Sequence, residues 1–312
     1  MKLNVNKFAQ AAGCLSPPVQ AALLRQAAFF NGIAQDIRLR AERPVAVACG
    51  GKTYFLTRAG NPTDLPCGDL LTAHREDVDA TFQRICNYSV YARQKEIVNG
   101  FITLSGGHRA GICGTAVLND NGITNIRAVS SINLRIAGER KGCAKGLYES
   151  IGSRGSVLIC GEPCSGKTTV LRDLARTLSI DGGQNVSLID ERGELAAVCD
   201  GVPQNDVGLC DVFDGYPKGE AIRQALRTMS PQVVICDEIG GKSDVAAVRD
   251  CLHRGVRLIA TAHARNETEL FGSVHLKEIL QTGAFATFVF LSGRNRAGEV
   301  SAVVRAGERR AA

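Results

Sequence analysis

Aromatic residues are scarce in this sequence: tryptophan is absent, and Phe and Tyr together make up 5% of the 312 residues. Proteins that bind single-stranded nucleic acid usually stack bases on aromatic side chains, so this scarcity argues against such a role. No block of five like charges occurs, which argues against a nucleic-acid-binding arm or a polybasic membrane tether. The longest apolar run, residues 284–291, contains Thr287 and is far shorter than the roughly 20 residues of a membrane-spanning helix.

The twelve cysteines form no CxxC pair, and the N-terminal segment lacks the apolar core of a secretory signal. Disulfides belong mainly to oxidising compartments, so we expect reduced cysteines and a cytosolic protein. Cys160 and Cys236 lie inside apolar runs, where thiols pack as small hydrophobic groups. With 45% hydrophobic and 22% charged residues, the chain is predicted to be globular, with about two domains.

A Gly/Ser stretch at 150–156 separates two regions with different patterns of apolar residues, so we predict domains at residues 1–148 and 149–312. Upstream, β-branched runs broken by glycine pairs mix with helical periodicity, which predicts a smaller α+β domain. Its expected elements are a helix at 19–30, a hairpin turning at Gly50-Gly51, helices within 76–99, and a second hairpin turning at 119–122.

Downstream, short and fully apolar strands alternate with helical segments. The predicted strands are 157–160, 186–189, 233–236, 257–260 and 288–291. Continuous apolar strands are typical of a sheet that is covered on both faces, so the second domain is predicted to be α/β with a mostly parallel sheet.

A glycine-rich segment follows the first of these strands and matches the pattern GxxxxGK[ST]. In such a loop, backbone N–H groups and the helix N-terminus hold phosphate, the lysine reaches the β- and γ-phosphates, and the hydroxyl ligates Mg²⁺. Because strand, loop and helix come in the required order, we predict a site for ATP and Mg²⁺ instead of an ordinary glycine-rich turn. Its predicted residues are Gly161, Glu162, Pro163, Cys164, Ser165, Gly166, Lys167, Thr168 and Thr169, with Thr168 also a magnesium ligand.

Two adjacent acids, Asp237 and Glu238, end the apolar strand at 233–236. We expect this strand to neighbour the strand of the phosphate loop, so that Asp237 is the second magnesium anchor. Glu238 is then placed to activate water as a general base. The alternative is a strand capped by two solvated acids. A water-activating acid, without an Arg-rich lid insert, favours a hydrolase over a small-molecule kinase.

Two further strands of this domain end in polar side chains, on the side where open α/β sheets bind ligands. One leads into an acidic segment, in which Glu191 and Glu194 are rival candidates for the general base. Arg192 lies between them and is a candidate for stabilising phosphate charge. The other strand leads to His263, which we predict to sense the γ-phosphate; a structural histidine is the alternative.

Taken together, the motifs resemble those of the type II and type IV secretion ATPases, which are RecA-like motors. Residues 227–240 resemble their Walker B block, 189–195 their acidic box, and 257–264 the end of their histidine box. The sequence is more similar still to the stage III sporulation protein AA family of endospore-forming bacteria. Motifs of that family occur in order from residue 36 to 263: DIRLR with RP, GGHRAG, SSINLRI, GKTTVLRDLAR, IDERGELA, GVPQNDVG and MSPQVVICDEIG.

This resemblance implies a RecA-like P-loop NTPase domain after the α+β domain, with Mg²⁺-dependent hydrolysis of ATP to ADP and phosphate. It also implies a homo-oligomer, expected to be a homohexamer, in the cytoplasm of the mother cell. There the motor is expected to support assembly or transport by a channel between mother cell and forespore. It would reach the forespore outer membrane only through membrane-embedded partners, and no nucleic acid is expected. Val256 stands where many secretion ATPases have a first histidine, so that histidine's role is not carried over.

The segment 105–111 holds one further candidate, Arg109, between two predicted strands. Its paired glycines are expected to turn His108 and Arg109 outward, where a guanidinium is suited to stabilise charge on a γ-phosphate. A hairpin tip with a solvated arginine is the alternative. The resemblance adds weight to the catalytic interpretation, because secretion ATPases bring arginines of the N-terminal domain over the nucleotide. Arg192 and Arg135 are rival donors.

A function of another class also fits the RecA-like pattern and the net charge of +6: a nucleotide-regulated protein that binds nucleic acid. A salt-sensitive affinity for single- or double-stranded nucleic acid would favour this alternative. The scarcity of aromatic residues favours the ATP-driven motor.

Overall fold

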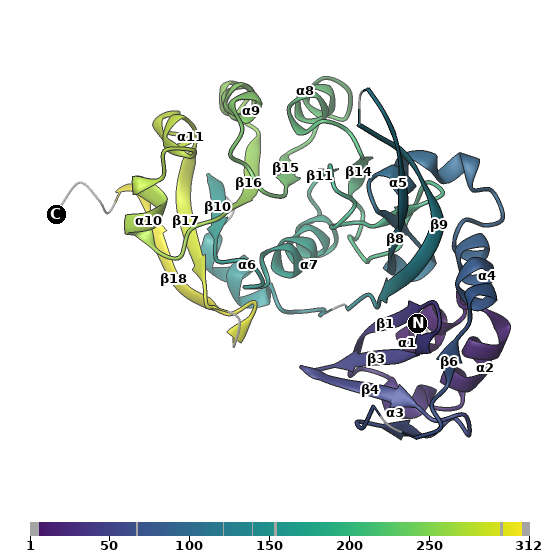
Figure 1. Ribbon diagram of the computed structural model, residues 1–312. Helices are drawn as coiled ribbons and strands as arrows, with labels where there is room; N and C mark the ends of the chain where they lie inside the picture. The colour runs from purple at the N-terminus through teal and green to yellow at the C-terminus, as the bar shows by residue number, and fades with distance from the viewer. Residues whose placement is uncertain are drawn as a thin grey trace. The chain divides into compact units, whose positions relative to one another are not determined.

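The structure is a computed structural model that describes residues 6–66, 68–120, 122–138, 140–152, 155–293 and 296–307, without the side chain of Lys242. The chain divides into two compact units, Met1–Gly138 and Glu139–Ala312 (Figure 1). This division comes earlier than the predicted boundary between residues 148 and 149. The reason is that α6 (Lys145–Ile151) contributes Leu147 and Ile151 to the hydrophobic core of the second unit.

The first unit is an α+β domain around a seven-stranded antiparallel sheet with the order β5-β4-β3-β1-β9-β8-β7. Both hairpin turns lie where the sequence predicts them. Gly50 and Gly51, with φ of 55° and 89°, join β3 to β4, and Asn119 pairs with Gly122 where β8 turns into β9. The strands are β1 (Ala34–Arg40), β3 (Ala46–Cys49), β4 (Lys52–Leu56), β5 (Pro62–Thr63), β7 (Phe101–Thr103), β8 (Arg109–Asn119) and β9 (Gly122–Arg135), with the separate pair β2 (Arg43–Pro44) and β6 (Thr72–Ala73).

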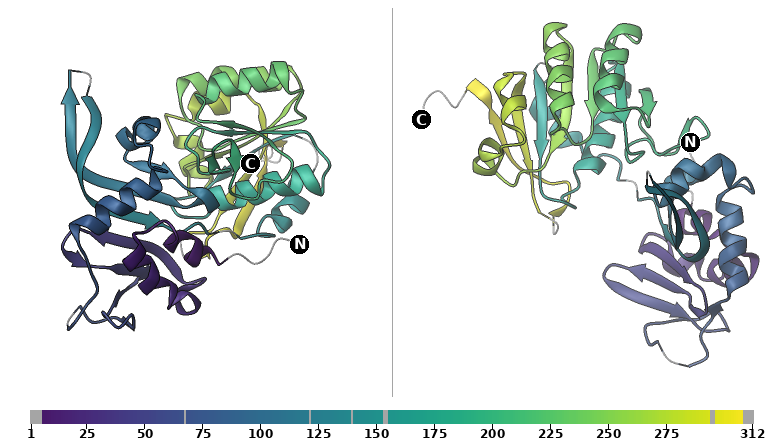
Figure 2. Two further views of the ribbon diagram at one scale, coloured as in Figure 1. Left: turned by 90° about the vertical axis from the view of Figure 1, so that its right-hand side faces the viewer. Right: turned by 45° about the horizontal axis from the view of Figure 1, so that its top comes forward.

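Helices of the first unit pack on one face of this sheet, because their apolar side chains share a single core with Ile37 and Leu39 of β1. The helix predicted over 19–30 is two helices, and beyond the break the Phe30 ring lies 5.0 Å from that of Phe8. From Cys113 outward, β8 is exposed and forms with β9 a two-stranded ribbon (Figure 2). The helices are α1 (Lys7–Ala12), α2 (Pro17–Leu24), α3 (Ala27–Phe30), α4 (Arg75–Ile85) and α5 (Gln94–Val98), with 3₁₀ turns at Tyr91–Arg93 and Ser105–Gly107.

The second unit is α/β, as the strand pattern predicts. Its sheet has the order β14-β11-β15-β16-β10-β17-β18, in which neighbouring strands run parallel except for the last pair. Strands β14 and β18 are additions that the sequence did not indicate. The strands are β10 (Ser156–Cys160), β11 (Val186–Asp190), β14 (Asp211–Asp214), β15 (Val233–Cys236), β16 (Arg257–Ala262), β17 (Phe285–Leu291) and β18 (Val300–Arg305), beside a small hairpin of β12 (Val198–Cys199) and β13 (Val202–Pro203).

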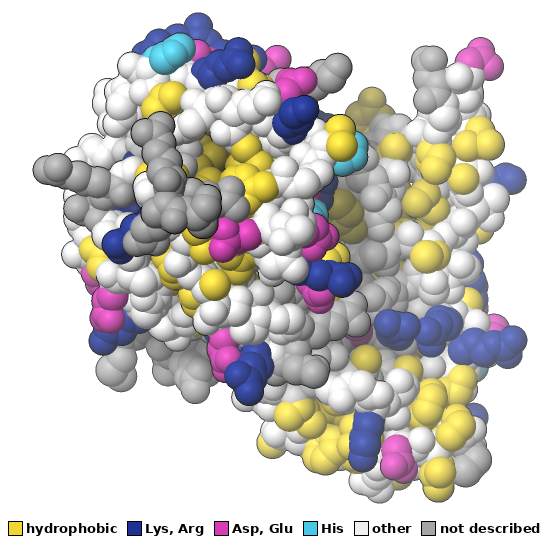
Figure 3. Space-filling view, turned by 90° about the vertical axis from the view of Figure 1, so that its left-hand side faces the viewer, with side chains coloured by type: hydrophobic (Ala, Val, Ile, Leu, Met, Phe, Trp, Pro, Cys, Tyr) yellow, Lys and Arg dark blue, Asp and Glu magenta, His cyan; other side chains and the backbone are white. Residues whose placement is uncertain are grey.

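Helices cover both faces of this sheet, since two separate clusters of apolar side chains flank it. Helices α6 and α7 (Lys167–Ile180) belong to one cluster. The other contains side chains of α8 (Lys218–Thr228), α9 (Lys242–His253), α10 (Glu267–Gly272) and α11 (Lys277–Gln281). On the face of this unit that Figure 3 presents, Lys and Arg side chains lie interspersed with Asp and Glu.

The sheet order corrects one sequence-based expectation. The strand before Asp237, β15, is not the neighbour of the phosphate-loop strand β10, because β16 lies between them. The end of β16, which includes Thr261, is therefore placed between the phosphate loop and the two acids.

Cysteine burial agrees with the thiols acting as packing groups. Cys160 and Cys236 are fully buried, and burial raises the pKa of the Cys160 thiol to about 12. Every cysteine among the described residues is a free thiol. Within the same part of the chain, no helix combines the length and apolar character needed to cross a membrane.

Candidate nucleotide-binding site

The phosphate loop joins the end of β10 to the start of α7, and its glycines are required by close packing. A Cβ atom on Gly161 would lie 2.4 Å from Ser165 Oγ, and one on Gly166 would lie 2.6 Å from the backbone nitrogen of Gly298. Gly166 also has a φ of 90°, which is the left-handed region that favours glycine. The Gly298 N–H donates to Ser165 O at 2.8 Å, so the β17–β18 connection supports the loop.

Lys167 begins α7 and is buried, although it carries a charge. Its Nζ donates to the carbonyl oxygens of Gly161 at 2.7 Å and Glu162 at 2.8 Å, and lies 3.3 Å from His263 Nδ1. Burial lowers the pKa of the Lys167 ammonium, and nearby carboxylates offset this only in part. The ammonium is thus held inside the loop by weak carbonyl partners that a phosphate oxygen can replace.

Asp237 lies beside the first turn of α7. Its two carboxylate oxygens accept hydrogen bonds from Thr168 Oγ1 at 3.2 Å and from Thr261 Oγ1 at 2.5 Å. Hydroxyl and carboxylate oxygens are suitable Mg²⁺ ligands, and a metal bound to phosphates needs only one or two protein carboxylates. Thr168 and Asp237 therefore fit the predicted magnesium position. Among the described residues no group of three His, Cys, Asp or Glu side chains forms a separate metal cage.

Glu238 follows Asp237 and is contacted through both its carboxylate and its backbone. Its carboxylate accepts from Arg192 Nη1 at 2.6 Å and from His263 Nε2, and its backbone N–H donates to Thr261 Oγ1 at 2.8 Å. Burial alone raises the pKa of Glu238, but the His263 hydrogen bond and the nearby cations outweigh burial, so the pKa lies below its ordinary value. An ionised carboxylate is the form that a general base requires.

His263 links the two halves of this site. Because its Nδ1 faces the Lys167 ammonium, its Nε2 carries the proton that it donates to Glu238. The predicted γ-phosphate sensor thus contacts both the phosphate-loop lysine and the candidate base.

The acidic segment after β11 divides into a structural and an exposed part. Asp190 is buried, and its carboxylate accepts from four backbone N–H groups of residues 194–197. Arg172 of α7 supports the same loop through the carbonyls of residues 194 and 195. Glu191 lies 3.7 Å from Lys218 Nζ, and Arg192 pairs with Glu238. Both side chains therefore belong to the site, whereas Glu194 is fixed through its backbone.

Arg109 lies in the first unit at the start of β8, opposite Arg135 in the strand register. Its guanidinium carbon lies 4.2 Å from the centroid of the Phe101 ring. Gly106 and Gly107, both with positive φ, form the expected tight turn, but the expectation that His108 points outward is wrong. His108 is fully buried, its Nδ1 accepts from the Ala137 N–H at 3.1 Å, and burial lowers its pKa to about 4.

The structure brings to this site a lysine that sequence reasoning missed. Lys218 follows β14, and its ammonium donates to the backbone carbonyl of Glu238. No signal in the sequence indicated this lysine, because the segment DVFD before it is too short and polar to predict a strand.

Sequence comparison places the chain in a family. Residues 6–310 match the family described as Sporulation stage III, protein AA. The chain belongs to the stage III sporulation protein AA family. A relative in this family, Stage III sporulation protein AA of Bacillus subtilis (strain 168), is 36% identical over 277 residues, which are 86% of this chain and 86% of the relative.

Solved structures show the fold of this chain. The pilus retraction motor PilT with bound ADP has a TM-score of 0.58 at 18% identity, covering 86% of this chain and 77% of PilT. The Legionella pneumophila ATPase DotB has a TM-score of 0.52 at 16% identity, covering 88% of this chain and 76% of DotB. The predicted class, a RecA-like domain preceded by a smaller α+β domain, is confirmed.

Proposed function

We propose that this chain is a Mg²⁺-dependent ATPase of the secretion-ATPase type that acts in sporulation. The observation behind the proposal is that three loops of one sheet edge bring Lys167, the Thr168–Asp237 pair and Glu238 into one hydrogen-bonded group. A buried ammonium, a hydroxyl–carboxylate pair and an ionised second acid are what phosphate binding, magnesium binding and water activation require.

Each group has a distinct task in this proposal. Lys167 and the loop amides bind the β- and γ-phosphates, and Thr168 and Asp237 hold Mg²⁺, which neutralises phosphate charge when it is bound. Glu238 accepts a proton from the attacking water. When the γ-phosphate attracts Lys167, His263 loses its contact with Lys167. The hydrogen bond from His263 to Glu238 then changes in response to the bound phosphate.

The wider role is also a proposal. The chain works as a homo-oligomer of six subunits on the cytoplasmic side of the mother cell. It supports assembly or transport by a channel to the forespore and meets the forespore outer membrane through membrane-embedded partners. Arg109 of the first unit stabilises charge on the γ-phosphate. Family membership supports the role in sporulation, and the likeness of fold to PilT and DotB supports a motor.

Phosphate release from ATP by the purified full chain tests this function. We expect release with Mg²⁺, none with EDTA, and none from Lys167→Ala. Light scattering with and without Mg²⁺ and ATP tests whether a ring of six forms. Absence of ATP hydrolysis, together with a salt-sensitive affinity for nucleic acid, would instead favour a nucleotide-regulated protein that binds nucleic acid.

A further inference from the structure

Glu238 has a left-handed backbone conformation, with a φ of 41°. This region is unfavourable for a residue with a Cβ atom, and such a residue remains there only when its surroundings hold it. Two contacts hold the Glu238 backbone from opposite sides. Its N–H donates to Thr261 Oγ1, and its carbonyl accepts from Lys218 Nζ. The strain therefore lies at the acid to which we assign water activation.

Lys218 reaches this carbonyl from a distant strand end. It follows β14, and in the sheet β11 separates β14 from β15, the strand that leads to Glu238. Neighbouring strands lie about 4.8 Å apart, so two spacings amount to about 10 Å, and a long side chain is needed to bridge them. On its way the ammonium lies 3.7 Å from Glu191 Oε2, and the Lys218 backbone N–H donates to Glu191 Oε1 at 3.4 Å.

The Lys218 side chain is mostly shielded from solvent. The Lys218 side chain is 11% exposed, whereas that of Arg192, which binds the Glu238 carboxylate, is 68% exposed. A largely buried ammonium needs partners, and the Glu238 carbonyl and Glu191 supply them. The two cations also differ in what they bind. Arg192 donates to a carboxylate oxygen of Glu238 that an attacking water needs, whereas Lys218 contacts Glu238 only at its backbone carbonyl and can stay in place during turnover.

We propose that Lys218 is a positioning residue for Glu238. It fixes the left-handed turn that aims the Glu238 carboxylate, and it joins the ends of β14, β11 and β15 into one unit. This inference rests on the proposed ATPase function and deepens it. It gives Glu191 the task of anchoring Lys218, which leaves Glu238 as the base.

The test compares the full chain with Lys218→Met, Lys218→Arg and the control Lys277→Met, which removes an exposed lysine of α11. For Lys218→Met we expect kcat to fall on the order of 10- to 100-fold, the usual effect of a misplaced catalytic group. The dissociation constant for a fluorescent ADP analogue should stay within about twofold, because Lys218 does not contact the phosphate loop in the structure. Arg keeps the length and a donor, so Lys218→Arg should retain at least about a third of kcat.

A second measurement needs no nucleotide. Hydrogen exchange in a peptide covering residues 237–241 should speed up about tenfold in ligand-free Lys218→Met, because the turn loses an anchor, while exchange in β10 stays unchanged. If the unaltered chain does not hydrolyse ATP, the proposed function fails, and the exchange result still decides whether Lys218 holds the turn. If the Met variant does not fold, Lys218→Gln replaces it, since its shorter amide cannot reach the carbonyl.

Glu191→Gln sharpens the test. We expect a loss of about threefold alone, and no further loss when it is added to Lys218→Met, because both changes act through the same contact. A kcat within threefold of the unaltered chain in Lys218→Met, unchanged exchange at 237–241, or a loss explained by weaker nucleotide binding would each overturn the proposal.

Discussion

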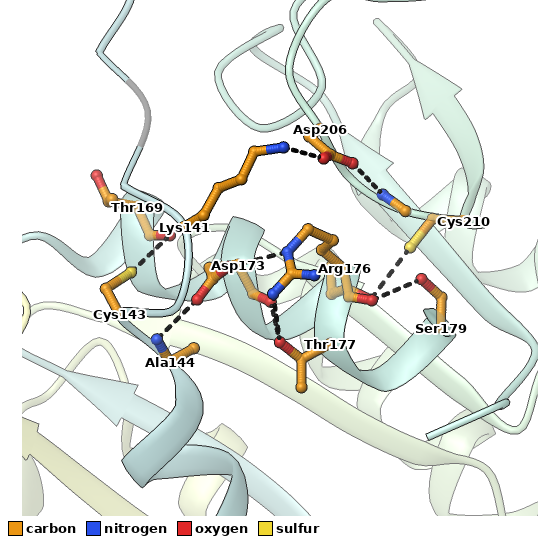
Figure 4. A network of polar contacts seen from close by, with 12 residues as sticks. Lys141, Cys143, Ala144, Thr169, Asp173, Arg176, Thr177, Ser179, Asp206 and Cys210 are labelled. Atoms are coloured by element: carbon orange, nitrogen blue, oxygen red, sulfur yellow. Dashed lines mark hydrogen bonds and ion pairs between the residues drawn. The ribbon is translucent and has the colours of Figure 1, made fainter. Parts of the chain in front are cut away.

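Two polar networks contact helix α7, and they differ in whether their partners are fixed parts of the scaffold or contacts that a ligand can replace. The network along the middle of the helix is centred on Asp173, whose side chain is only 4% exposed (Figure 4). One carboxylate oxygen of Asp173 accepts from the Ala144 N–H at 2.8 Å and the other from Arg176 Nε at 3.0 Å. Each partner is part of the scaffold, because Ala144 precedes α6 and Arg176 belongs to α7 itself.

The network at the start of α7 is built in the opposite way. Lys167 is held by carbonyls of its own loop, Glu238 has a strained backbone, and the side chain of His263 is 49% exposed. Lys167, His263 and Glu238 contact one another through the same atoms that a bound nucleotide or an attacking water would contact. Burial with scaffold partners is therefore typical of a structural network, whereas backbone strain and replaceable contacts indicate a candidate site.

The largest expected effect is that of Lys167→Ala. ATP turnover should fall below detection, on the order of 10³-fold or more, because the phosphates lose their cationic ligand. The fold should persist, with the melting temperature within about 3 °C of that of the unaltered chain. Nucleotide binding, phosphate release and thermal unfolding measure this. Undiminished turnover would end the interpretation of residues 161–168 as a phosphate loop.

Arg109→Ala tests whether the site extends to the first unit. As a γ-phosphate finger, Arg109 should contribute about 10³-fold or more to turnover at nearly normal ATP affinity. If a neighbouring subunit supplies the finger, mixing with Lys167→Ala subunits should restore activity, since these keep their own Arg109. Arg135→Ala and Arg192→Ala test the two rival donors in the same assay. A loss below about tenfold would make Arg109 a surface arginine.

Glu238→Gln tests the base directly. The amide keeps the shape but cannot accept a proton, so hydrolysis should fall by roughly 10² to 10⁴ while nucleotide affinity is retained. Single-turnover phosphate release and nucleotide titration separate the two quantities. If Glu238→Gln instead lost nucleotide binding while its residual ATP hydrolysis stayed normal, Glu238 would have a structural role. Glu191 or Glu194 would then become the candidate base.

Local sequence patterns were enough to single out the segments whose residue types and spacing are set by the needs of phosphate and Mg²⁺ binding. The loop at 161–168 and the acids after β15 follow from the spacing that phosphate and Mg²⁺ require, and the apolar strands follow from burial on both faces. The order of the strands could not be obtained in this way. Each buried strand is a similar apolar run, and which run lies beside β10 depends on the whole sheet.

Long-range contacts account for the other errors and omissions. The glycines before His108 indicated a tight turn correctly, but the direction of the turn depends on Ala137, which lies 29 residues further along the chain. Lys218 and Gly298 reach the site from loops beside β14 and β18, which were not predicted as strands. A residue that acts through a backbone atom leaves no pattern of side chains to recognise.

The smallest effect on activity, and a clear effect on stability, is expected for Asp173→Asn. The amide cannot accept both hydrogen bonds of the carboxylate, which should cost about 2 kcal/mol of unfolding free energy and about 4–8 °C in melting temperature. Turnover should stay within threefold. Asp181→Asn, at the exposed end of the same helix, is the control and should change neither quantity.

The pH dependence of this deficit gives the sharper test. Burial raises the pKa of Asp173, but hydrogen bonds from the Ala144 and Gly142 backbone and from Arg176 outweigh it, so the folded pKa lies below the ordinary value of 3.8. A lowered pKa means that the carboxylate stabilises the fold above this ordinary value, and that the contribution is lost as pH falls through the folded pKa. Urea unfolding at about pH 7 and about pH 3 should therefore show the difference between Asp173→Asn and the unaltered chain shrinking in acid. If Asp173→Asn instead reduced turnover more than tenfold at unchanged stability, this network would belong to the catalytic site, and the contrast between the two ends of α7 would not hold.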